Sequence, residues 1–142
     1  MRDLYHEIEV RRALSPVATA LADDTVQVSE IIDMRGFKSM IFVILTGTLA
    51  DSNATFAVLI EDGDDSGLSD NTAVDDDQLL GTESLIGFDF ADDDDVRKIG
   101  YRGEKRYVRM TITPSGNSGD APLAAIAIMG DPDDRPTTAQ AD

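Results

Sequence analysis

One stretch decides the fold of this 142-residue chain: Phe37-Lys38-Ser39-Met40-Ile41-Phe42-Val43-Ile44-Leu45. From Met40 onward it is apolar without interruption, and its length fits a strand and falls far short of the roughly 20 residues that span a membrane. A second stretch, Leu123-Ala124-Ala125-Ile126-Ala127-Ile128-Met129, is apolar throughout. Strands with two apolar faces lie centrally in a sandwich, or have their outer face covered by another layer or subunit. Both stretches are therefore predicted to be such strands.

Three further stretches, residues 25–29, 54–61 and 106–113, alternate apolar and polar residues, as half-buried strands do. The apolar faces predicted for them consist of Val26 and Val28, of Phe56, Val58 and Ile60, and of Val108, Met110 and Ile112. No segment of a dozen residues carries an apolar stripe at helical spacing. Gly, Pro, Asn and Asp separate the predicted strands. The predicted fold is therefore all-β, an antiparallel β-sandwich or a jelly-roll-like barrel with acidic loops.

Domain organisation follows from length and composition. Residues 1–130 are predicted to form a single β-sandwich domain, and residues 131–142 a flexible acidic tail, because the tail has no apolar run to bury. The chain has no Cys, so its core is expected to hold without disulfides. Its first residues lack the apolar centre of a signal peptide, so we expect synthesis in a cytoplasm and a soluble product.

The charge is large, negative and segregated. The chain has 28 Asp and Glu against 12 Lys and Arg, a net charge of -16, which opposes binding to nucleic acid or to an anionic membrane surface. Residues 61–95 hold 14 acids and no Lys or Arg. Half of the basic residues follow within residues 96–109, in what is predicted to be one hairpin: Arg97, Lys98, Arg102, Lys105, Arg106 and Arg109. These side chains either pair with the acidic loops of the same subunit or contact a partner.

The acidic segment contains a partial calcium motif. Asp62, Asp64, Ser66 and Gly67 match the first half of an EF-hand loop, with Asp70 nearby. Position twelve of the loop, which needs a bidentate Glu, is Ala73, and the preceding segment is predicted to be a strand. Asp62, Asp64, Ser66 and Asp70 are therefore candidates for a weak calcium site only, and the alternative is a solvated acidic loop. No other cofactor is expected.

The sequence offers few of the residues on which enzyme active sites depend. His6 is the only histidine, and without Cys neither a Cys-His pair nor a zinc-thiolate site can be built. The glycines match no phosphate-binding fingerprint. We therefore expect no enzymatic activity.

Over about residues 2–130, the sequence resembles a family of small head proteins of tailed bacteriophages. The segments that carry the resemblance include Arg12-Ala13-Leu14-Ser15-Pro16-Val17, Asp77-Gln78-Leu79-Leu80-Gly81-Thr82-Glu83, Lys98-Ile99-Gly100-Tyr101 and Lys105-Arg106-Tyr107-Val108-Arg109. Members of this family look like capsid decoration, or cement, proteins. The resemblance implies a virion protein on the outside of an icosahedral head, made in the bacterial host, with the major capsid protein and further copies of itself, as a homotrimer, as partners.

That role needs a surface for the shell and a surface for self-association. The candidates for contact with the capsid are the N-terminal and basic residues Arg2, Tyr5, His6, Arg97, Lys98, Arg102, Lys105, Arg106 and Arg109. The candidates for the subunit interface come from the two apolar strands: Ile41, Val43, Leu45, Ala125, Ala127 and Met129. Two alternatives remain open, a β-sandwich adhesion or calcium-dependent binding module and a head-tail joining or tail-tube protein.

Overall fold

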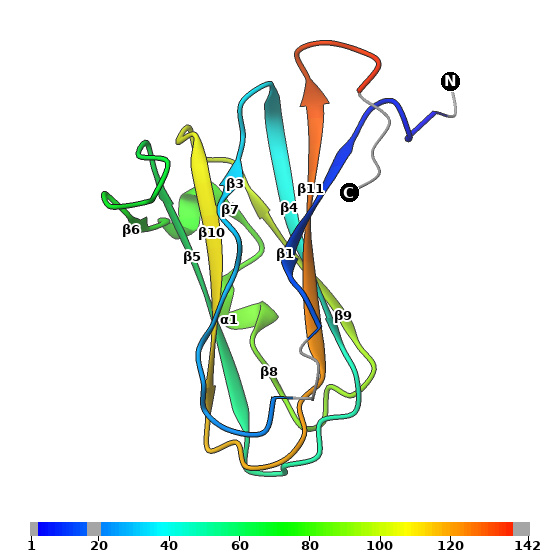
Figure 1. Ribbon diagram of the computed structural model, residues 1–142, viewed down its shortest axis with the longest axis vertical. Helices are drawn as coiled ribbons and strands as arrows, with labels where there is room; N and C mark the ends of the chain where they lie inside the picture. The colour runs from blue at the N-terminus through cyan, green and yellow to red at the C-terminus, as the bar shows by residue number, and fades with distance from the viewer. Residues whose placement is uncertain (1–2, 17–20, 138–142) are drawn as a thin grey trace.

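Two antiparallel sheets packed face to face make up the molecule (Figure 1). The computed structural model describes residues 3–16 and 21–137. The predicted all-β sandwich is confirmed. In the described part of the chain, no helix has the length and apolar character of a membrane span. Among the described residues the helical segments are two short ones, η1 (Asp76–Gln78) and α1 (Glu83–Ile86), in the long connection of residues 64–95, which carries 12 of the 28 acids.

The first sheet has five strands. Their order across the sheet is β1 (Glu9–Leu14), β11 (Leu123–Pro132), β4 (Phe37–Thr46), β9 (Val96–Tyr101) and β7 (Leu79–Leu80). The two strands that the sequence gives two apolar faces, β4 and β11, pair with each other and have neighbours on both sides. Their predicted central position is therefore confirmed.

The second sheet is built on two long strands, β5 (Thr55–Gly63) and β10 (Tyr107–Ser115), which pair along their whole length. Short strands flank them: β2 (Gln27–Val28) and β3 (Ile32–Asp33) pair with β10, and β6 (Thr72–Ala73) and β8 (Phe88–Asp89) pair with β5. The chain passes repeatedly from one sheet to the other, so that β9, β10 and β11 lie in alternate sheets. This crossing pattern is that of a double-sheet jelly roll.

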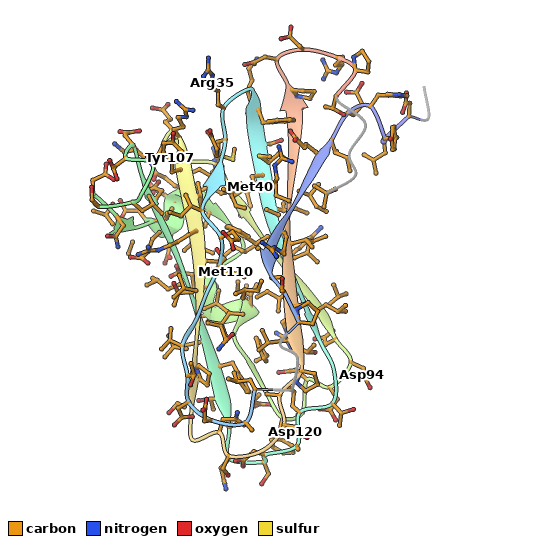
Figure 2. The ribbon with its side chains drawn as sticks, viewed as in Figure 1. Arg35, Met40, Asp94, Tyr107, Met110 and Asp120 are labelled. Atoms are coloured by element: carbon orange, nitrogen blue, oxygen red, sulfur yellow. The ribbon has the colours of Figure 1, made fainter. Side chains whose placement is uncertain are left out.

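The core lies between the sheets, where Met40 of β4 and Met110 of β10 are both buried (Figure 2). The inward faces predicted for residues 54–61 and 106–113 are confirmed, since Ile60, Val108 and Ile112 are fully buried. The face predicted for residues 25–29 is wrong. Val28 pairs with Thr111 on the outer side of the second sheet and is 53% exposed.

The chain beyond residue 130 continues the last strand of the first sheet. β11 continues through Asp131 and Pro132, and Pro132 pairs with Phe37 of β4. Beyond the strand, the Thr137 amide donates to the carbonyl of His6 at 3.0 Å. The predicted domain boundary therefore falls inside a strand, and the part of the predicted tail at 138–142 lies outside the described residues.

Candidate interaction surface

The basic residues do not form one hairpin, so that prediction is wrong. β9 belongs to the five-stranded sheet and pairs with β4 and β7, whereas β10 pairs with β5 in the other sheet. The segment between them crosses from one sheet to the other, as the jelly-roll topology requires. Lys98 and Arg109 therefore lie on the outer sides of the two sheets, Arg97 lies on the inward side of β9, and Arg102, Lys105 and Arg106 lie in the crossing segment.

Most of these cations already have acidic partners in the same chain. The ion pairs are Arg97 with Asp92 and Asp95 at 2.6 and 3.1 Å, Lys105 with Asp64 at 2.8 Å, Arg106 with Asp33 at 2.9 Å, and Arg109 with Glu61 at 3.2 Å. The hydrogen bonds from Arg106 hold the pKa of Asp33 below its ordinary value. Pairing with the acidic loops is thus confirmed for Arg97 and Lys105, whereas Arg106 and Arg109 pair with the strand residues Asp33 and Glu61. Lys98 and Arg102 are exposed and have no such ion pair among the described residues.

The N-terminal candidates lie at one end of the sandwich. Tyr5 is 61% exposed and packs edge-on against the His6 ring, with 5.1 Å between ring centroids. The His6 ring contacts the carboxylate of Asp3, with 2.6 Å from Nδ1 to Oδ2. Arg2 lies outside the described residues. Contact of this end with a capsid stays a prediction.

The partial EF-hand loop uses its carboxylates to hold its own backbone. Asp70 accepts from the amides of Asp64 and Asp65 at 2.9 and 3.2 Å, and Asp65 accepts from the amides of Gly67 and Ser69. Those backbone hydrogen bonds lower the pKa of Asp65. No group of three or more His, Asp or Glu side chains gathers as a metal site in residues 3–16 and 21–137. Calcium binding by Asp62, Asp64, Ser66 and Asp70 therefore stays a prediction.

Asp62, the first residue of that motif, belongs to the interior. It is 5% exposed, and its Oδ2 accepts a hydrogen bond of 2.6 Å from the hydroxyl of Tyr101, which is 3% exposed. Because Asp62 lies on β5 and Tyr101 on β9, this hydrogen bond joins the two sheets. The Lys105 amide also donates to the Tyr101 hydroxyl, at 3.1 Å. Burial, followed by the hydrogen bond to Asp62, raises the pKa of the Tyr101 phenol well above its ordinary value of 10.0.

We expect Tyr101→Phe to lower the free energy of unfolding by about 1–3 kcal/mol, because the buried Asp62 carboxylate loses its partner. The pH dependence should change as well. The folded state favours the neutral phenol, so this stabilisation is complete below the unfolded-state pKa of 10.0 and decreases as the pH rises above it. Urea unfolding at neutral and alkaline pH should show an alkaline loss in the wild type that the variant lacks. Equal alkaline slopes for the two proteins would contradict this assignment.

The two central strands each have one buried and one outward face. On β11 the inward residues are Ala125, Ala127 and Met129, all at most 2% exposed, so they cannot contact a second subunit in this fold. Their selection as interface residues is wrong by one position in the strand, since the outward residues of β11 are Ala124, Ile126 and Ile128. On β4 the selected residues Ile41, Val43 and Leu45 do lie outward, alternating with the buried Phe42 and Ile44.

Strand pairing places the outward residues in rows across the sheet. One row runs from Arg12 through Ile126 and Val43 to Lys98. A second runs from Val10 through Ile128 and Ile41 to Gly100 and Leu80, and a third joins Ala124, Leu45 and Val96. We define these twelve positions as the outer apolar face. Its most exposed apolar members are Leu45 at 57%, Val96 at 61%, Leu80 at 58% and Ile126 at 39%.

Carboxylates are missing from this face. None of its twelve positions is Asp or Glu, although the chain contains 28 of them, and the charged residues that it carries are the cations Arg12 and Lys98. The outward side of the other sheet is different, because there polar and charged residues such as Thr111, Thr113 and the Arg109–Glu61 ion pair surround single apolar residues such as Leu59. A contiguous exposed apolar face rimmed by polar residues is typical of a protein interaction site.

An open hollow between β1 and β3 is one of several concave features among the described residues. It is lined by Glu9, Arg11, Glu30, Asp33 and Arg35, among others. Its charges largely neutralise one another, since Arg11 pairs with Glu9. Such paired, solvated side chains give no nucleophile with an adjacent base, so the hollow does not suggest a reaction.

No protein-family model matches the sequence, and no curated protein does either. Among solved structures, the chain is similar to the SPBc2 prophage-derived protein YomS, with 8% identity and a TM-score of 0.44 over 87% of this chain and 92% of that one. It is also similar to murine APRIL, with 7% identity and a TM-score of 0.43 over 87% and 99%. A third similarity is to the CBM32 of AlyQ, with 17% identity and a TM-score of 0.40 over 89% and 97%. Similarities at this level carry no argument about function.

Proposed function

We propose that this chain is a bacteriophage capsid decoration protein, which binds the outside of an icosahedral head and stabilises the lattice of the major capsid protein. The outer apolar face is the observation that carries the proposal. A contiguous exposed apolar face, whose longest row crosses five strands, is typical of a protein interaction site, as a structural component of an assembly needs. The resemblance of the sequence to phage head proteins specifies the kind of assembly.

The chemistry of such a role is purely non-covalent. A decoration protein contributes binding free energy across the seams between capsid subunits, which opposes the outward pressure of packaged DNA. Subunits that bind as an oligomer gain avidity, because binding of one copy holds the others at high effective concentration. The acidic loops between β5 and β9 would then point into solvent and keep a crowded particle surface soluble.

The test is the protein content of gradient-purified particles from the phage that encodes this chain. We expect mass spectrometry to find it in a copy number comparable to that of the major capsid protein. Particles without it should release DNA at a lower temperature. Absence from the particles would overturn the proposal, and a copy number of only a few per particle would replace it with a head-tail joining role.

A further inference from the structure

We infer that the outer apolar face binds the same face of a second copy of this chain. This inference deepens the proposed function, since it names one of the partners of that surface. It depends on three features of the structure: the area of the face, its lack of carboxylates, and its small residues Ala124 and Gly100.

The area of the face fits a small, weak interface. With strands about 4.8 Å apart and outward residues about 6.6 Å apart along each strand, its twelve positions cover roughly 380 Å² per copy. Two copies meeting face to face would bury about 760 Å² in total, which is below the size of a standard specific interface. Weak association is therefore expected, favoured by high local concentration on a particle.

Charge decides where two copies of this chain can meet. Each copy carries a net charge of -16, so most approaches bring carboxylate against carboxylate. The outer apolar face has no Asp or Glu at its twelve positions, and the Glu30 carboxylate beside Arg12 is paired with it at 3.5 Å, so repulsion is smaller here than over the acidic loops. The two cations, Arg12 on β1 and Lys98 on β9, lie toward opposite sides of the face, beside the Ile126–Val43 pair at its middle.

Small residues on the outer apolar face allow a second sheet to approach closely. Ala124 is outward on β11, and Gly100 of β9 has no side chain, which lets Leu80 lie over it. A Cβ on Gly100 would lie 2.9 Å from the Leu80 Cβ, so a larger residue there would push Leu80 outward. Apart from Arg12 and Lys98, no charged side chain projects from the twelve positions, so the apolar side chains between these two cations can meet those of a second sheet.

The experiment is sedimentation equilibrium on the purified full chain over a range of concentrations and at two ionic strengths. We expect reversible self-association that strengthens with salt, because the Debye length falls from about 10 Å at 0.1 M to about 3 Å at 1 M and net repulsion is screened. Association through ion pairs would weaken instead, and that result would overturn the inference.

Matched variants locate the interface. Ile126→Glu places a carboxylate at the centre of the face and should weaken association at least 100-fold. Leu59→Glu is its control, because Leu59 is outward on the other sheet and 37% exposed, against 39% for Ile126. The control should associate within threefold of the wild type, and circular dichroism melting checks that each variant folds. Should Ile126→Glu not fold, Leu45→Glu, at a 57% exposed position, takes its place.

The inference fails if the wild type is monomeric at every concentration and salt, or if Leu59→Glu weakens association as much as Ile126→Glu does. Either result leaves the proposed function standing as long as purified particles contain the protein. Conversely, a protein that self-associates through this face but is absent from particles would refute the proposed function alone. The two tests therefore fail independently.

Discussion

Replacing Arg97 with Gln should lower the free energy of unfolding by about 2–3 kcal/mol, somewhat less than the loss of a fully buried ion-pair partner. Only 20% of the Arg97 side chain is exposed, and it pairs with Asp92 and Asp95. Its guanidinium also donates to the carbonyls of Leu85 and Gly87 at 3.1 and 3.2 Å. One cation thus holds together the segment from α1 to β9, in which four consecutive residues are Asp. Without it, Asp92 and Asp95 repel each other across a half-buried site.

Urea unfolding of the variant, in low and in high salt, measures this effect. Salt should recover part of the lost stability, since it screens the remaining carboxylates. Arg106→Gln is the control, because Arg106 also makes a hydrogen-bonded pair with an aspartate, Asp33, but lies on the surface, where such pairs contribute little. Equal losses for the two variants would show that Arg97 does not organise this segment.

The sequence predicts the acidic segment as turns, and the structure explains how the turns are made. Asp93 accepts from the amide of Leu49 at 2.7 Å, and the hydroxyl of Thr46 donates to the carbonyl of Asp92 at 2.9 Å. The tendency of Asp to cap backbone amides is a local property, so composition alone predicts it. Which amides receive the caps depends on β4 lying beside this segment, about 45 residues away in sequence, and no local pattern contains that information.

The predicted basic hairpin failed for a related reason. Two strands separated by a short polar turn usually pair with each other, and residues 96–101 and 107–115 follow that pattern. In a jelly roll, successive strands instead enter opposite sheets, so the turn of residues 102–106 becomes a crossing. Charge clustering along the sequence therefore did not become clustering in space, and the contiguous exposed apolar surface lies on the central strands instead.

The prediction of interface residues was also limited because β4 and β11 lack an alternation of apolar and polar residues. Strands with an alternating pattern, such as residues 54–61, identify their own buried face, and there the prediction was confirmed. In β4 and β11 both faces are apolar, so the sequence locates the strands but leaves each residue's direction undetermined. The selected residues of β4 happened to be outward, whereas those of β11 were inward. Register against the neighbouring strands is what resolves this ambiguity.

Adjacent residues of β4 give the largest contrast that this fold predicts. Phe42 is fully buried in the core, whereas Val43 lies at the middle of the outer apolar face, opposite Ile126 and Lys98. Phe42→Ala should lower the free energy of unfolding by about 3–5 kcal/mol, through lost burial and the cavity left behind. Val43→Ala, the control in the same strand, should cost less than about 1 kcal/mol in the isolated chain, because no cavity forms on an open face.

The variants Phe42→Ala and Val43→Ala also distinguish an effect on the free energy of unfolding from an effect on self-association. Urea unfolding at a concentration where the chain is monomeric gives the two stabilities, and sedimentation at high concentration gives the two association constants. Val43→Ala removes apolar contact area from the face without disturbing the core, so it should weaken self-association while leaving the monomer folded. Phe42→Ala should unfold more readily, yet associate normally as long as it is folded. If instead Val43→Ala destabilised the monomer as strongly as Phe42→Ala, the face assignment of β4, and with it the interaction surface, would be wrong.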